Sequence, residues 1–293
     1  DSYPGNRVLI GETRLPRIEE LDAWYGGSRR DELQLPMDLQ VGFTDKLDAN
    51  LLRKRIVDAE TKLHGEPLFV FDNHDRPRSW DRYGDGVHNG AIARIVATLL
   101  LASRDTAMLY DGQEIGMVTT PPARKEDVKD PIGITGWPKQ KGRDGERTAM
   151  QWYAGKDAGF SSAASTWLRV PPSYTKVNVQ TEQENRNSLL SWYRQLIELR
   201  RTNAALRGGR MEMLERENPS VIAWVRVGDA GKDSTLVAVN CTDETRTIVL
   251  DPSAYGVHGH VVRTLLTDAA ALEGQSTFTI KLPPFASWIG SVQ

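Results

Sequence analysis

Apolar runs and helix-like segments alternate along the first two-thirds of this chain of 293 residues. Some segments are short, apolar and bounded by glycine or acidic residues, as strands are, and others carry apolar side chains at helical spacing. The predicted strands are 8–10, 33–41, 69–71 and 106–110, and the predicted helices are 16–25, 46–63, 89–103 and 187–202. Strand–helix units in a row predict a parallel sheet with right-handed crossovers, and the short strands favour a barrel over a long open sheet.

The pattern changes after Gly208-Gly209, where helical segments give way to strand-like ones separated by turn residues. The strands predicted in this part are 221–227, 235–239, 245–250, 261–266 and 277–282. We therefore predict an α/β domain over residues 1–207 and an antiparallel β domain, expected to be a sandwich, over residues 208–293.

The most informative stretch is the polar cluster that follows the apolar run Pro67 to Phe71. This cluster, Asp72 to Arg78, contains carboxylate, imidazole and guanidinium groups. Parallel α/β folds place their chemistry at the carboxyl ends of strands, so these groups form a candidate catalytic set. The alternative is a simple loop cap, because Asp and Asn also make Asx turns on protein surfaces.

A second acidic group, Glu12, follows the predicted strand 8–10, as Asp75 follows the strand 69–71. Paired carboxylates in a sugar-binding cleft do acid/base and ion-stabilising work. Desolvation among apolar strand residues would favour the protonated form of Glu12 that a general acid needs, whereas His74, Arg76 and Arg78 would keep Asp75 ionised. An N-cap or an ordinary ion pair on a loop explains Glu12 equally well from the pattern alone.

Composition and charge exclude several classes of protein. The net charge of −2 gives no indication of a nucleic-acid or anionic-membrane partner, and no apolar stretch approaches transmembrane length. The single cysteine, Cys241, cannot form an intrachain disulfide, which fits a reducing compartment, and we expect a cytoplasmic location. Residues 1–5 contain neither an initiator methionine nor a signal peptide, so the sequence looks like the interior of a longer protein.

Several motifs, in the same order and with similar spacing, resemble the α-amylase superfamily (glycoside hydrolase family 13), and within it the α-glucosidase and oligo-1,6-glucosidase branch. The motifs that carry this resemblance are Gly11-Glu12-Thr13, Tyr25-Gly26-Gly27, Asp31 to Pro36, Phe71 to Asp75, Gly112 to Met117, Asp130 to Gly133, Gly142 to Trp152 and Val170 to Tyr174. The resemblance implies the C-terminal half of a (β/α)8 barrel, strands five to eight, followed by an antiparallel β-sandwich.

The resemblance also implies a role for each matching residue. Glu12 matches the general acid/base after barrel strand five, and Asp75 matches the aspartate that stabilises the transition state after strand seven. His74 matches the residue that hydrogen-bonds the glucose in the cleaved subsite. Arg143 matches the arginine that helps to fix the non-reducing-end glucose, which suits exo-action. Asp144 and Arg147 are expected to brace that loop by ion pairing.

The chain also departs from the family. The nucleophile, an aspartate after strand four, has no match, nor does the first half of the barrel. Half a barrel would expose two sheet edges, so we predict that the N-terminal half of the same enzyme, as a separate chain or fragment, completes it. No metal or cofactor is expected in this chain, and the resemblance allows a structural calcium or magnesium ion in the other half.

The resemblance implies a retaining, exo-acting α-glucosidase that hydrolyses terminal glucose from short α-glucosides. An α-glucosyl transferase or sucrose isomerase on the same scaffold is the first alternative. A non-catalytic binding or scaffold relative is the second. The sequence does not distinguish linkage preference, the ratio of hydrolysis to transfer, or the oligomeric state.

Overall fold

The computed structural model describes residues 5, 7–229, 233–257, 259, 262–268 and 279–292. The chain divides into two compact units. The first comprises Asp1–Phe71, Thr98–Met108 and Leu196–Gln293, and the second comprises Asp72–Ala97 and Leu109–Gln195. The first unit holds the strands described below, and the second holds most of the loops that carry candidate site residues.

A parallel sheet lies in the first unit and confirms the predicted strand–helix alternation. Its strands are β1 (Ile10–Gly11), β2 (Leu35–Asp38), β3 (Leu68–Val70) and β4 (Thr106–Met108), in that spatial order. All three neighbouring pairs are parallel. The apolar side chains of β3 are buried on both faces, as expected for an inner strand of a parallel sheet. The carboxyl ends of these strands therefore share one edge of the sheet.

The predicted strand 33–41 is shorter than expected, and its last third is helical. The strand ends at Asp38, whose Oδ1 accepts the Gln40 N–H at 2.8 Å and so begins helix α2 (Leu39–Gly42). At the end of α2, the Gly42 backbone packs directly on β3. A Cβ on this residue would lie 2.0 Å from the Val70 carbonyl oxygen. A capping aspartate and a glycine thus override the alternating pattern.

The predicted helices form with ends shifted by a few residues. They are α1 (Ile18–Ala23), α3 (Ala49–Lys62), α5 (Asn89–Ala102) and α8 (Leu189–Thr202). Shorter helices also occur in the connections, namely α4 (Ser79–Tyr83), α6 (Pro131–Gly136), α7 (Val179–Glu184) and α9 (Ala204–Gly208). Within the described residues, no helix combines the length and the apolarity that crossing a membrane would require.

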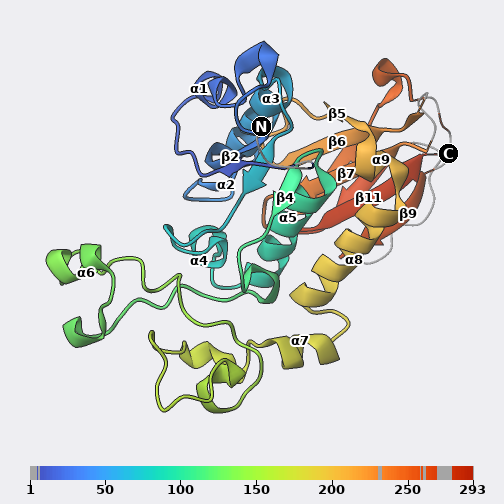
Figure 1. Ribbon diagram of the computed structural model, residues 1–293. Coiled ribbons are helices and arrows are strands. Elements are labelled where there is room, and N and C mark those ends of the chain that lie inside the picture. The colour runs from blue at the N-terminus through green and yellow to red at the C-terminus, as the bar shows by residue number, and fades with distance from the viewer. Residues whose placement is uncertain are drawn as a thin grey trace. The chain divides into compact units, whose positions relative to one another are not determined.

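The C-terminal part is antiparallel, as predicted (Figure 1). One sheet has the order β5-β6-β7-β11-β9, and a smaller sheet pairs β8 with β10. The strands are β5 (Arg210–Met213), β6 (Val221–Val227), β7 (Thr235–Asn240), β8 (Arg246–Val249), β9 (Val262–Thr267), β10 (Thr279–Leu282) and β11 (Ser287–Val292). Strands β5 and β11 were not predicted. Residue 261 and residues 277–278 of the predicted strands lie outside the described residues, and the 207/208 domain boundary stays a prediction.

Buried polar contacts tie the antiparallel sheet to the other elements of the first unit. Arg226 on β6 is fully buried and donates to the carbonyl oxygens of Ala102 and Ser103, where α5 ends. It also donates to the Gly209 carbonyl at 2.8 Å. Just after β7, Cys241 is buried and free, and burial raises the pKa of its thiol to about 12.

Candidate active site

Directly after β3, the buried side chains of Asp72 and Asn73 hold a turn in the chain, and this turn leaves His74 and Asp75 exposed. Asp72 is buried and accepts the Ser79 hydroxyl at 2.9 Å. Asn73 is buried as well, and its Oδ1 accepts the backbone N–H groups of Asp75 at 2.9 Å and of Arg76 at 3.1 Å. This is an Asx turn, the local structure that Asn favours. The turn and the candidate catalytic set are therefore the same feature, since the turn presents His74 and Asp75 outward.

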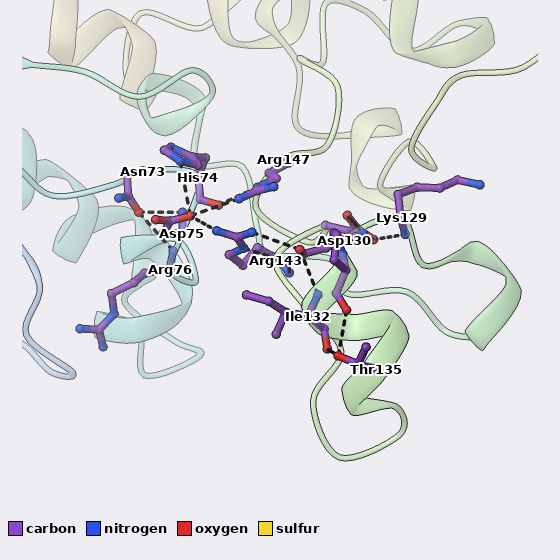
Figure 2. A network of polar contacts seen from close by, with 12 residues as sticks. Asn73, His74, Asp75, Arg76, Lys129, Asp130, Ile132, Thr135, Arg143 and Arg147 are labelled. Carbon is purple, nitrogen blue, oxygen red and sulfur yellow. Dashed lines mark hydrogen bonds and ion pairs between the residues drawn. The ribbon is translucent and has the colours of Figure 1, made fainter. Parts of the chain in front are cut away.

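Asp75 is held by cations on one oxygen. Its Oδ1 lies 2.7 Å from Arg143 Nη1, 3.1 Å from Arg147 Nη2 and 3.4 Å from His74 Nε2 (Figure 2). Desolvation raises the pKa of Asp75, but the hydrogen bond from Arg143, the charge of His74 and the bond from Arg147 outweigh it, and the pKa is lowered. The surroundings of this carboxylate therefore favour its ionised form.

The pKa of Asp75 is lowered, in the expected direction, and His74 is one of its neighbours, but the expectation for Arg78 is wrong. Arg78 is fully buried and points elsewhere, donating to the carbonyl oxygens of Asp111 and Glu146. Arg76 donates its backbone N–H to Asn73 Oδ1, and its side chain points away from Asp75 (Figure 2). The cations on Asp75 come instead from Arg143 and Arg147, which are distant in the sequence.

A second loop supplies Arg143 and supports it. Arg143 donates its backbone N–H and its Nε–H to Asp130 Oδ2 at 2.7 and 2.9 Å, and its Nη2 to Oδ1 at 3.1 Å. Asp144 is buried and accepts the backbone N–H groups of Lys129 at 2.6 Å and of Asp130 at 3.1 Å. Asp144 thus braces the loop by accepting backbone N–H groups, where an ion pair was expected. Arg147 braces it by ion pairing, as expected, and also donates to the His74 carbonyl at 2.9 Å.

Glu12 directly follows β1, at the carboxyl edge of the parallel sheet. Its side chain is exposed, so the apolar enclosure expected around it is not provided by the residues that the structure describes. The neighbouring Thr13 is buried and donates its hydroxyl to the Met37 carbonyl at 3.0 Å, which fixes the chain just after Glu12. The structure therefore places Glu12 in the first unit, and His74, Asp75 and Arg143 together in the second.

Asp130 was not among the predicted site residues. It is fully buried at the side chain and lies 13 positions before Arg143. The only sequence signal was its place in the motif Asp130 to Gly133. In the second unit, the carboxylates of Asp75 and Asp130 are both paired with the Arg143 guanidinium. The expectation that this chain needs no metal stays a prediction.

Comparison with known proteins identifies the family. The model of the α-amylase catalytic domain matches residues 7–209. An oligo-1,6-glucosidase from Bacillus cereus is 30% identical over 267 residues, which cover 81% of this chain and 47% of that protein. Maltase A2 from Drosophila melanogaster is 35% identical over 205 residues, which cover 69% of this chain and 33% of that protein. The chain thus spans about half the length of the Bacillus relative, or less for the other.

Solved structures agree with this result. A trehalulose synthase from Pseudomonas mesoacidophila MX-45 matches with a TM-score of 0.84 and 26% identity, over 98% of this chain and 55% of that one. An isomaltulose synthase mutant from Erwinia rhapontici NX5, in complex with D-glucose, matches with a TM-score of 0.82 and 26% identity, over 98% and 55%. The family model over residues 7–209 and these relatives lead to one conclusion: the chain belongs to the α-amylase family, glycoside hydrolase family 13.

Proposed function

We propose that this chain is part of a retaining, exo-acting α-glucosidase that removes terminal glucose from short α-glucosides. The observation that carries the proposal is the ionised Asp75 carboxylate beside His74 and Arg143, in a chain that the α-amylase family model matches over residues 7–209. The names of the similar oligo-1,6-glucosidases support the substrate class.

The proposed reaction has two steps. A nucleophilic carboxylate from the N-terminal half of the enzyme attacks the anomeric carbon while Glu12 donates a proton to the leaving oxygen. Glu12 then takes a proton from water, which releases glucose with its configuration retained. Asp75 stabilises the positive charge that develops on the sugar ring, and His74 and Arg143 hold the terminal glucose.

We further propose that the chain forms strands five to eight of the barrel, with a β-sandwich after them, and that the N-terminal half of the enzyme pairs with β1. The edge at β1 is apolar and open among the described residues: Val8, Leu9 and Ile10 are 61, 58 and 50% exposed. An exposed apolar edge strand normally requires a cover. A denaturing gel and an intact-mass measurement of the active enzyme test this, and full activity from a single species with the mass of this chain alone would disprove it.

Replacing Glu12 by glutamine in the complete enzyme tests the catalytic assignment. Maltose hydrolysis should fall by at least about 1,000-fold, because the leaving alcohol can no longer be protonated. Cleavage of 4-nitrophenyl α-glucoside should suffer less in its first step, because that leaving group needs little protonation. Glu19→Gln is the matched control, since Glu19 is exposed and pairs with Lys62 on the surface. Undiminished maltose hydrolysis by Glu12→Gln would refute the assignment.

A second candidate function is glucosyl transfer or sucrose isomerisation. The similar trehalulose and isomaltulose synthase structures favour it, at TM-scores of 0.84 and 0.82. Product analysis with concentrated sucrose separates the candidates: glucose plus fructose indicates hydrolysis, whereas a rearranged disaccharide indicates isomerisation. The sequence upstream of Asp1 tests a non-catalytic role, which the absence of a nucleophilic aspartate there would favour.

A further inference from the structure

We infer that Asp130 is a positioning residue, which holds the Arg143 guanidinium in the orientation that contacts the terminal glucose. The inference rests on the proposed function, because the contact between Arg143 and glucose belongs to it. It adds a residue, on a different loop, that does not itself touch the sugar.

The contact between the two side chains is bidentate. Asp130 Oδ2 accepts Nε–H at 2.9 Å and Oδ1 accepts Nη2–H at 3.1 Å, so the plane of the guanidinium is set by two parallel bonds. Oδ2 also accepts the backbone N–H of Arg143 at 2.7 Å. One carboxylate therefore fixes both the backbone and the end of the same side chain (Figure 2).

Asp130 is itself held firmly. Its side chain is 0% exposed, and its backbone N–H donates to Asp144. Its Oδ1 also accepts the Ile132 N–H at 3.3 Å, at the start of α6. Gly142 crosses so closely that a Cβ there would lie 2.9 Å from the Asp130 Cβ. Asp130 thus lies where two loop segments pack closely together, and its side chain has little room to change conformation.

The Arg143 guanidinium has an edge, between Nη1 and Nη2, that Asp130 does not occupy, and we assign this edge to the sugar site. Asp130 uses the Nε and Nη2 side of Arg143, and Nη1 faces Asp75 at 2.7 Å. Arg143 itself is 31% exposed at its side chain, so without Asp130 it would be free to sample other rotamers. A pre-oriented cation binds a hydroxyl group without paying that ordering entropy, which is the contribution we assign to Asp130.

The test replaces Asp130 by asparagine in the complete enzyme. Asparagine keeps an oxygen for the Ile132 N–H but loses the charged second oxygen. We expect kcat/KM for 4-nitrophenyl α-glucoside to fall by about 10- to 100-fold, with the affinity for 1-deoxynojirimycin, a glucose-shaped cation, falling in parallel. Asp127→Asn is the control, since Asp127 pairs with Arg124 on an exposed turn three residues away. It should stay within about twofold of wild type.

A double-mutant cycle separates positioning from general support of the fold. If Asp130 acts through Arg143, then Asp130→Asn should change kcat/KM by less than about twofold in an Arg143→Ala background. A full additional loss in that background, or an unaltered single variant, would overturn the inference.

The binding measurement separates this inference from the proposed function. A wild type that binds 1-deoxynojirimycin through Asp130 but hydrolyses nothing would uphold the inference and refute the glucosidase. An active wild type whose Asp130→Asn variant behaves normally would refute the inference alone. A wild type that neither binds nor hydrolyses would refute both.

Discussion

Asp75 Oδ1 lies 2.7 Å from Arg143 Nη1, although 68 positions separate the two residues along the chain. Arg147 adds a second guanidinium to the same oxygen from 72 positions away. Two cations on one carboxylate oxygen keep Asp75 ionised and fix its direction. The charge of the candidate site is thus set by a loop distant in the sequence from the strand that carries Asp75.

Replacing Arg147 by methionine should weaken catalysis and alter its pH dependence. The pKa of Asp75 is lowered partly by the hydrogen bond from Arg147, so losing that bond should move the acidic limb of the kcat/KM profile to higher pH. At mildly acidic pH we expect roughly a tenfold loss, the equivalent of one charge-assisted hydrogen bond. Arg124→Met, which breaks an exposed ion pair with Asp127, is the control. An unshifted acidic limb would contradict the prediction.

Asp38→Asn should stabilise the enzyme at neutral pH. Burial raises the pKa of Asp38 to about 6, and its Oδ2 is buried without a hydrogen-bond partner. Because the folded state binds the proton more tightly than the unfolded state, the free energy of unfolding falls as pH rises from about 4 to about 6. Asparagine cannot ionise, so it avoids this decrease, and its Oδ1 still caps α2. The free energy of unfolding should therefore rise by about 1–3 kcal/mol at pH 7.

Urea unfolding at pH 5 and pH 7 would measure this gain, which should be larger at pH 7. Asp48→Asn is the matched control, since Asp48 caps α3 by accepting the Leu51 N–H at 3.0 Å. Asparagine caps helices as well as aspartate does, so the control should stay within about 0.5 kcal/mol of wild type. Equal free energies of unfolding for Asp38→Asn and wild type at both pH values would show that the buried Asp38 carboxylate does not destabilise the fold.

Gly42→Ala should destabilise the parallel sheet. The added methyl group would meet the Val70 carbonyl oxygen at 2.0 Å and the Phe71 Cα at 2.5 Å, so α2 must move away from β3. We expect a loss of about 2–4 kcal/mol. Gly90→Ala in α5 is the control, because a Cβ there has no atom within 4 Å, and it should be neutral or stabilising by up to about 1 kcal/mol. Equal Tm values for the two variants in a thermal melt would show that α2 can shift away from β3 at little cost.

Arg226→Met should loosen the attachment of the antiparallel sheet to α5. The carbonyl oxygens of Ala102 and Ser103 would lose a buried donor, at a cost of about 3 kcal/mol. Arg201→Met provides the comparison, since Arg201 makes an exposed pair with Glu198 and should change stability by less than about 0.5 kcal/mol. Differential scanning calorimetry of both variants checks the difference.

The sequence predicted most of the strands and helices because apolar spacing reports burial directly. It also placed the candidate carboxylates at strand ends, because Glu12 and Asp75 follow apolar runs. It placed His74 beside Asp75 correctly but not Arg78, because closeness in the chain does not determine where a side chain points: Arg78 is buried and donates to backbone carbonyl oxygens. The sequence did not predict the helical turn at 39–42. A capping contact and a close backbone approach cause this turn, and neither leaves a signal in the spacing of apolar residues.

Cys241 has a practical consequence, since it is the one thiol of these 293 residues and lies buried beside β7 with its pKa raised to about 12. A neutral, enclosed thiol does not react with alkylating or disulfide reagents at neutral pH. Its modification therefore requires that the antiparallel sheet open locally. The rate at which a thiol reagent labels this chain therefore measures how often the antiparallel sheet opens locally around Cys241.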